Sequence, residues 1–292
     1  MNGGIAVNIL SKKKILMIGN SFTYYGKCVL EKSRTVLEIE PRQNDKGYFY
    51  QICKSEGVDI SVTNWTWGGH ALRDTFSEKC TFPRECTGEN HFSYLTDLVY
   101  DYVYIQEGTR NTGAKSTLEY CKNIMKTFRN VNPYVKFIFP VHIGYYVRNG
   151  YEDILQNISE FERLGMTIVG WGRLVNDIIN GVINVPNGKQ KYNKNSFIVS
   201  QSANDGFHPN MLSGYITALM TYCAITGESA VGKDFSFCGN TEVNSAFDFK
   251  EYCDKYYTYD DAVSNFVDIF TSQEDITGIQ KLIDKYIAEK LY

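Results

Sequence analysis

The sequence lacks long apolar runs and any strong excess of one charge. No run of about eighteen apolar residues occurs, so we expect no membrane-spanning helix. Thirty basic and thirty-three acidic residues give a formal net charge of −3, which gives no reason to expect nucleic acid or an anionic membrane surface as a partner. With 43% hydrophobic residues and only 6 prolines, the composition is that of a globular protein and excludes a disordered or collagen-like chain.

Metal-binding and nucleotide-binding patterns are also missing. The 4 histidines lie far apart, none of the 8 cysteines forms a Cys-x-x-Cys pair, and neither His-Glu-x-x-His nor Gly-x-Gly-x-x-Gly occurs. We therefore expect no metal site. We interpret the cysteines as free buried thiols of a cytoplasmic protein. At the N-terminus the short apolar stretch within residues 1–10 comes before the basic residues Lys12–Lys14, whereas in a secretory signal the basic residues come first. The alternative is an exported protein with disulfides whose signal has been removed.

The apolar residues that are present alternate between two patterns. Short continuous apolar runs, typical of strands buried on both faces, occupy residues 14–19, 58–63, 102–105, 135–141 and 166–169. Helical spacing occurs between them, at residues 116–128 and 152–164. Strands that alternate with helices predict an α/β fold with a mainly parallel five-stranded sheet and helices on both faces.

Two further helices are predicted near the C-terminus, at residues 209–226 and 275–290, where apolar residues follow one helical face. Residues 182–204 and 228–260 are polar and weakly periodic, so we interpret them as excursions from the same unit. With no internal repeat and no low-complexity linker, residues 1–292 are expected to form one domain.

The first candidate functional residue is Ser21, in the segment Gly19-Asn20-Ser21-Phe22-Thr23. It directly follows the first predicted strand and so belongs at the carboxyl edge of the sheet, where open α/β folds bind their ligands. A serine here is a candidate nucleophile, although it can equally cap a helix. The segment is not the Gly-x-Ser-x-Gly elbow of α/β-hydrolases.

The second candidate is Asp205-Gly206-Phe207-His208-Pro209, just before the predicted helix at 209–226. An aspartate and a histidine three residues apart on a turn can point to the same side, so that Asp205 holds the imidazole of His208 and leaves Nε2 as a general base. Such a base would activate the Ser21 hydroxyl, which is a poor nucleophile near neutral pH. The alternative is that Asp205 caps the helix.

Other polar residues follow the remaining predicted strands. Gly68 and Gly69 allow a ligand to approach the backbone closely, so the amide of Gly69 is a candidate oxyanion donor, and the Gln106 side chain is another. Glu107 can orient a loop or pair with Arg110. The candidates for substrate contact are Asn20, Trp67, His70, Glu107 and His142, although a framework role for His142 is favoured and His70 also rivals His208 as the base.

Taken in order, these segments resemble the blocks of the SGNH (GDSL-like) hydrolase superfamily. Gly19–Thr23 corresponds to the serine block, Gly68-Gly69 to the glycine block and Asp205–Pro209 to the Asp-x-x-His block, over about residues 13–227. The chain departs from the pattern at Gln106-Glu107-Gly108, where the family usually has Gly-x-Asn-Asp, so the residue at the third oxyanion position differs from that of the family. Residues 228–292 match no block and are expected to be a helical extension.

The resemblance implies a three-layer α/β/α, flavodoxin-like fold and serine ester hydrolysis without metal or organic cofactor. The implied triad is Ser21, His208 and Asp205, with oxyanion donors from the Ser21 and Gly69 amides and the Gln106 side chain. The 22 tyrosines, with Trp65 and Trp67 near the glycine block, favour O-acetyl groups on a carbohydrate as the substrate. The alternatives are a lipid esterase, general carboxylesterase or thioesterase, and a non-catalytic glycan-binding protein on a hydrolase scaffold.

Overall fold

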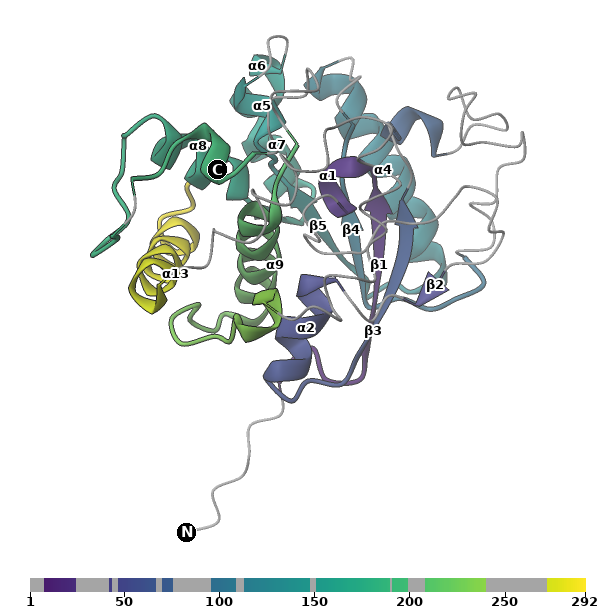
Figure 1. The fold of residues 1–292 in the computed structure, drawn as a ribbon. Helices are drawn as coiled ribbons and strands as arrows, with labels where there is room; N and C mark the ends of the chain where they lie inside the picture. Colours follow the sequence, from purple (N-terminus) through teal and green to yellow (C-terminus); the bar gives the residue numbers. More distant parts are fainter. Residues whose placement is uncertain are drawn as a thin grey trace, which may run out of the picture.

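A six-stranded sheet forms the centre of the molecule (Figure 1). The computed structural model describes residues 8–24, 42–43, 47–66, 70–75, 96–108, 113–147, 151–189, 191–198, 208–239 and 272–292. Its strands, in the spatial order β2-β3-β1-β4-β5-β6, are β2 (Arg42–Gln43), β3 (Ile60–Thr66), β1 (Lys13–Gly19), β4 (Tyr102–Ile105), β5 (Lys136–Pro140) and β6 (Met166–Val169). The last five are parallel, whereas β2 is a short antiparallel edge.

The five parallel strands confirm the predicted fold class. Numbered by their order along the chain, they are arranged 2-1-3-4-5, which is the flavodoxin-like order. In such a sheet the chain reverses its direction of winding beside the first strand, and the carboxyl ends of the strands there form a crevice. The loop after β1 therefore lies where this fold places ligands. The sequence did not predict β2, which is only two residues long.

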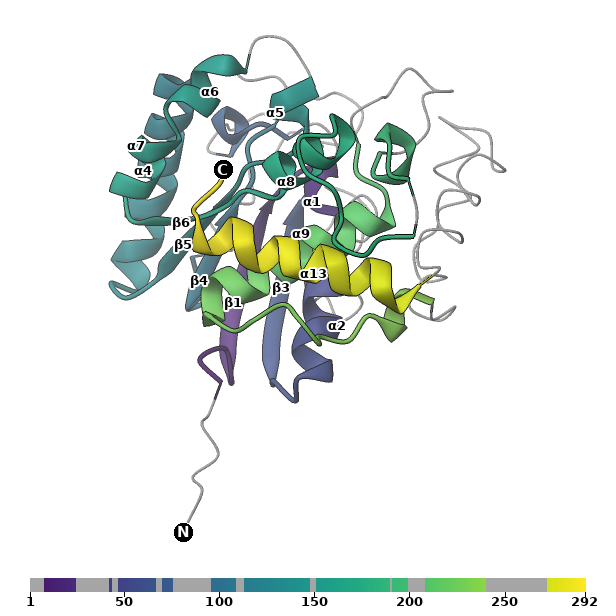
Figure 2. The same ribbon diagram turned by 90° about the vertical axis from the view of Figure 1, so that its left-hand side faces the viewer.

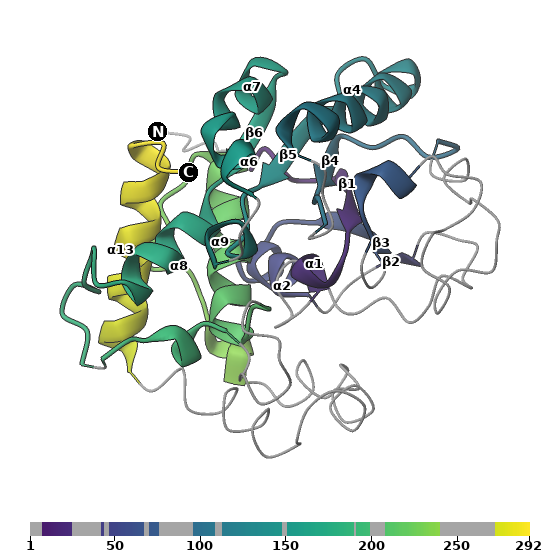
Figure 3. The same cartoon turned by 90° about the horizontal axis from the view of Figure 1, so that it is seen from above.

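Helices cover both faces of the sheet, as Figures 2 and 3 show. One face carries α2 (Tyr48–Ser55), α8 (Trp171–Ile179), α9 (Met211–Thr226) and α13 (Gln273–Ala288). The other carries α4 (Ala114–Val131), α6 (Glu152–Gln156) and α7 (Ile158–Arg163). Strand β1 supplies both cores: Ile15 and Met17 point to the first, Leu16 and Ile18 to the second, and all four are fully buried. Burial on both faces explains why this strand is a continuous apolar run.

The single helix predicted over residues 152–164 is wrong. The structure has two short helices there, α6 and α7, separated at Asn157, whose φ of −110° and ψ of 16° are not helical. The Asn157 side chain bonds back to the carbonyl oxygen of Asp153 at 2.7 Å. The Asn157 N–H keeps its own bond to the same carbonyl oxygen at 3.2 Å, so the break lies in the backbone conformation of Asn157, which periodicity alone does not register. Helices α2 and α8 were not predicted either.

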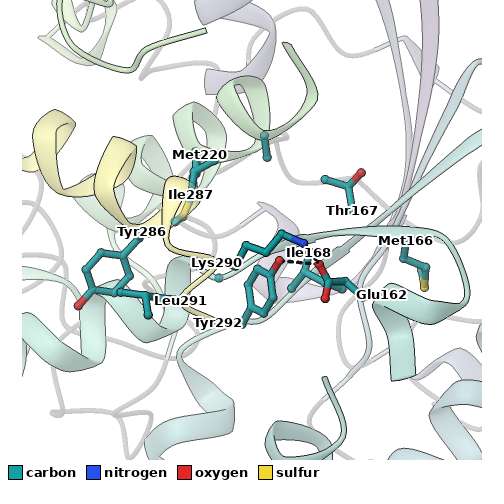
Figure 4. Close-up of a pocket in the computed structure, with 12 residues that line it drawn as sticks. Glu162, Met166, Thr167, Ile168, Met220, Tyr286, Ile287, Lys290, Leu291 and Tyr292 are labelled. Atoms are coloured by element: carbon teal, nitrogen blue, oxygen red, sulfur yellow. Dashed lines mark hydrogen bonds and ion pairs between the residues drawn. The ribbon is translucent and has the colours of Figure 1, made fainter. Parts of the chain in front are cut away.

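The last helix, α13, packs across α8 and α9 and carries the C-terminal residues to the edge of the sheet (Figure 2). Its Tyr286 hydroxyl donates to Asp177 of α8 at 2.8 Å. Beyond the helix, Lys290 and Tyr292 both bond to Glu162, at 2.7 and 2.9 Å (Figure 4). These contacts border a cavity of 280 Å³ between β6, α9 and α13, which neither Ser21 nor His208 lines.

Two further expectations from the sequence, on membrane-spanning helices and on free thiols, can be compared with the described residues. None of the helices within the described ranges is long and apolar enough to cross a membrane. Cys53, Cys121, Cys223 and Cys238 are buried free thiols, as expected. The other cysteines, at positions 28, 80, 86 and 253, lie outside the described residues.

Candidate active site

Ser21 lies at the carboxyl end of the central strand, as its position after the first apolar run predicts. Strand β1 ends at Gly19, and Ser21 begins the short helix α1 (Ser21–Tyr24). A Cβ on Gly19 would lie 2.8 Å from the Cβ of Gln106, the residue that follows β4. Glycine is therefore needed here because two neighbouring strand ends approach closely. The Ser21 side chain is half-buried, so it is accessible at the surface.

Asn20 fixes the turn that carries Ser21. Its side-chain oxygen accepts from the backbone N–H of Phe22 at 3.0 Å, and its amide donates to the carbonyl oxygen of His70 at 2.9 Å. The residue is only 1% exposed. In this structure, Asn20 thus bonds to the backbone on both sides of the site, and we regard it as the support of the serine turn.

His208 reaches Ser21 from the far end of the chain. Its Nε2 lies 2.7 Å from Ser21 Oγ, a hydrogen-bonding distance. The segment is anchored by Asn210, which caps α9 by accepting from Leu212 N at 3.0 Å and donates to Ser196 O at 2.9 Å. The bridge between Pro209 and Ile198 holds it as well. A neutral imidazole in this position can accept the serine proton.

His70 is held inside the protein. Its ring is fully buried and its Nε2 lies 2.9 Å from the hydroxyl of Thr75. Burial lowers the pKa of His70 to about 3, although the backbone of Gly19 partly opposes the shift. The ring is therefore neutral across the physiological range and a very weak base. Of the two histidines considered as the base, the ring that contacts Ser21 is that of His208.

Glu107 and Gln106 continue β4 and are both buried. Glu107 Oε1 accepts from Leu72 N at 3.0 Å and from Gly108 N at 2.6 Å, and Thr117 of α4 lies 3.3 Å from the other oxygen. Burial raises the pKa of Glu107 to about 7, against the effect of these donors. The carboxyl group thus orients the loop after β3, one of the two roles considered from sequence.

The Gln106 amide lies directly beside the serine turn. Its Nε2 donates to the carbonyl oxygen of Glu107 at 2.9 Å, and its Oε1 makes no hydrogen bond within the described part of the chain. The side chain is fully buried and packs against Gly19. One N–H of the amide is thus used by the backbone, which leaves the other for a further acceptor.

Three predicted site residues, Asp205, Gly69 and Trp67, lie outside the described residues.

His142 follows β5, is fully buried and stacks on Phe22 with ring centroids 3.9 Å apart. Trp65 is half-buried and meets the His70 ring edge-on at 5.9 Å. The structure thus brings Ser21, His208, Asn20 and Gln106 together, with His70, Glu107 and His142 buried behind them.

Sequence reasoning missed the supporting residues. Phe22 and Thr117 each contact a residue of the site, and Asn210 anchors the segment that carries His208, but nothing in the sequence context of Phe22 or Thr117 distinguishes them from core residues. Only Asn210 had a usable signal, because asparagine before an apolar helix is a common N-cap. The part of the chain that the structure describes contains no group of three or more His, Cys, Asp or Glu residues able to hold a metal ion.

No protein-family model and no curated protein matches the sequence. Solved structures that are similar to the chain include a protein from Parabacteroides merdae described as a GDSL-like lipase, with 12% identity over 76% of this chain and 98% of that one, and a TM-score of 0.48. An acetylxylan esterase from Geobacillus stearothermophilus has 15% identity, 74% and 96% coverage and a TM-score of 0.44. A carbohydrate esterase of family 3 from Talaromyces cellulolyticus has 13% identity over 70% of this chain and 92% of that one, and a TM-score of 0.47.

Proposed function

We propose that this chain is a serine ester hydrolase of the SGNH type. The observation that carries the proposal is the 2.7 Å contact between His208 Nε2 and Ser21 Oγ, at the carboxyl edge of a flavodoxin-like sheet. A serine becomes a competent nucleophile when a neighbouring base can take its proton, and this pair meets that requirement. The Asp205 carboxylate is proposed to orient the imidazole.

In the proposed reaction, Ser21 Oγ attacks the carbonyl carbon of an ester while its proton moves to His208 Nε2. The negative charge that develops on the carbonyl oxygen would be stabilised by the Ser21 and Gly69 amides and by the free N–H of Gln106. His208 then returns the proton to the departing alcohol oxygen as its bond to carbon breaks, which leaves an acyl-serine. Water attacks this ester with His208 again as base, releasing the acid and restoring Ser21.

The proposed substrates are O-acyl esters of carbohydrates, most simply O-acetyl groups. The support comes from the sequence, in which 22 tyrosines and 3 tryptophans supply rings that can stack on sugar faces. Hydrolysis rates should therefore fall steeply from acetyl to octanoyl aryl esters, and an O-acetylated oligosaccharide should release acetate. A preference for the long acyl chains would instead indicate a lipid esterase or thioesterase.

Covalent labelling tests the proposal directly. A fluorophosphonate should label the wild-type chain, mass spectrometry should locate the adduct on Ser21, and Ser21→Ala and His208→Ala should both abolish labelling and ester cleavage. Ser229→Ala is the matched control, because Ser229 is an exposed serine that bonds to Asp284 and lies outside the site. Absence of labelling, together with measurable affinity for a glycan, would contradict the proposal and favour a binding protein.

A further inference from the structure

Five aromatic rings form a continuous column that begins at His208. The His208 ring stacks on Phe22 with centroids 5.1 Å apart and an interplanar angle of 27°. Phe22 stacks on His142 at 3.9 Å and 23°, and His142 contacts Tyr145 at 3.8 Å and 42°. Tyr145 in turn stacks on Tyr151 at 5.4 Å and 29°. The column thus continues inward from the ring that contacts Ser21.

The rings come from three segments of the chain, the turn after β1, the segment between β5 and α6, and the residue His208 before α9. Phe22 belongs to α1 after β1, His142 follows β5, Tyr145 lies on α5 (Gly144–Val147), and Tyr151 immediately precedes α6. These four side chains are between 0% and 6% exposed, whereas His208 is half-exposed. Four buried rings therefore support one ring at the surface.

The fold provides space for this column at two glycines. A Cβ on Gly144 would lie 2.8 Å from Nδ1 of His142 and 3.0 Å from Cζ of Phe22. A Cβ on Gly172, at the start of α8, would lie 2.6 Å from the carbonyl oxygen of His142. Side chains at these positions would displace His142 or Phe22, so the close packing of the rings depends on both glycines.

We propose that this column positions the imidazole of His208 for Ser21, an inference that rests on the proposed function. The torsion that rotates a histidine ring is broad and roughly two-fold, so the imidazole needs a contact that selects one orientation. A stacked neighbour supplies such a contact. Phe22 directly follows Ser21, so the ring that orients the base and the hydroxyl that it must meet share one short turn. Phe22 is thus a positioning residue, supported by His142.

The Phe22 ring also faces the charge that forms on His208. When the imidazole takes the serine proton it becomes a cation, and a cation within about 6 Å of an aromatic face is stabilised by the electrons of the ring. The centroid separation of 5.1 Å meets this condition. Because the charge exists only after proton transfer begins, this contact should act on the chemical step and hardly on substrate binding.

The experiment compares Phe22→Leu with Phe161→Leu. Phe161 is a matched control, since it is fully buried and stacked, on Phe139 at 4.3 Å and 21°, but belongs to the core under α7. Both variants should unfold at lower urea concentration than the wild type. Only Phe22→Leu should lower kcat, by about 3- to 10-fold, the change expected when one stacking contact is lost. Its KM should change less than about two-fold. Equal kcat in the two variants would overturn the proposal.

A second pair of variants tests the column one ring further from Ser21. His142→Leu removes that ring, whereas His142→Phe keeps an aromatic ring against Phe22. His142→Phe should retain a higher kcat than His142→Leu at unchanged KM, and equal losses would count against the column.

Fluorophosphonate labelling distinguishes a failure of the proposed function from a failure of the column. An unlabelled wild type would refute the proposed function and the column with it, whereas a labelled wild type and a Phe22→Leu variant labelled equally fast would refute the column alone.

Discussion

The side-chain amide of Asn20 donates to the carbonyl oxygen of His70 at 2.9 Å and so joins the loop after β1 to the loop after β3. The same side chain accepts from Phe22 N at 3.0 Å. Both bonds are buried, and together they require one donor and one acceptor on a short side chain. Asparagine provides both, whereas an ionised aspartate can only accept.

Asn20→Asp should therefore be damaging in this chain. The variant keeps the bond from Phe22 N but places a carboxylate oxygen against the carbonyl oxygen of His70. A buried polar group left without its partner costs about 1–3 kcal/mol, and more when it is charged. We expect urea unfolding at pH 8 to show a loss of this size, and ester hydrolysis to fall.

The matched control for this substitution is Asn193→Asp. Asn193 is exposed, and its side chain acts as an acceptor, from Asn195 N at 2.9 Å, at the start of a short 3-10 helix. Aspartate is an equally good cap there, so the stability should change by less than about 0.5 kcal/mol. If Asn20→Asp were as stable and as active as the control, the amide bond to His70 would have no structural importance.

Glu107→Gln should change how the stability of the protein depends on pH. Burial raises the pKa of Glu107 from 4.5 to about 7 in the folded state, so between these values the folded protein holds a proton that the unfolded chain has released. The stabilisation is complete below pH 4.5 and is lost as the pH rises to 7, a change of about 3 kcal/mol. Glutamine keeps an acceptor for Leu72 N and Gly108 N without titrating.

Urea unfolding at pH 5 and pH 8 measures this effect as a difference between variants. The free energy of unfolding of Glu107→Gln should decline less than that of the wild type over the interval. Glu119→Gln is the control, because Glu119 lies on the exposed face of α4, where it pairs with Lys122. Parallel pH profiles for wild type and Glu107→Gln would show that the buried carboxyl does not titrate in this range.

The features that the sequence predicted correctly are those that rest on burial over a whole element. Strand β1 is continuously apolar from Ile15 to Ile18 because both of its faces are covered there, and α9 was found within two residues because a proline, an apolar face and a final glycine define it. The site position followed from the same logic, since a serine after a central parallel strand must lie at the carboxyl edge. None of this requires knowledge of individual side-chain contacts.

The features that the sequence did not predict depend on contacts between distant residues. The strand at Arg42–Gln43 is defined by its pairing with Thr63 and Asn64 of β3, about twenty residues further along the chain. Within the site, Phe22 has the composition of a core residue, and only its position between two imidazoles gives it a further role. Likewise, Glu107 could be assigned to loop orientation only once Leu72 and Thr117 were placed against it.

Tyr286→Phe should weaken the attachment of the C-terminal helix. The Tyr286 hydroxyl donates to Asp177 at 2.8 Å, and Arg173 donates to the same carboxylate oxygen at 2.7 Å. Removing one of two donors to a buried carboxylate should cost about 1–2 kcal/mol. Tyr134→Phe is the control, because that side chain is 88% exposed and its hydroxyl is solvated. Equal unfolding midpoints for the two variants would contradict the attachment.

Gln106→Leu tests the third oxyanion donor, at the position where the chain departs from the family pattern. Leucine keeps the Cβ and Cγ that pack on Gly19 but removes the amide, so a purely structural glutamine would be replaced with little effect on turnover. If the free N–H binds the oxyanion, kcat should fall by about 10²–10³ with a small change in KM. Thr23→Val is the matched control beside Gly19, since the Thr23 side chain also packs against Gly19 and its buried hydroxyl makes no hydrogen bond within the described part of the chain. That variant should keep the wild-type kcat, and a Gln106→Leu enzyme that did the same would remove Gln106 from the oxyanion hole.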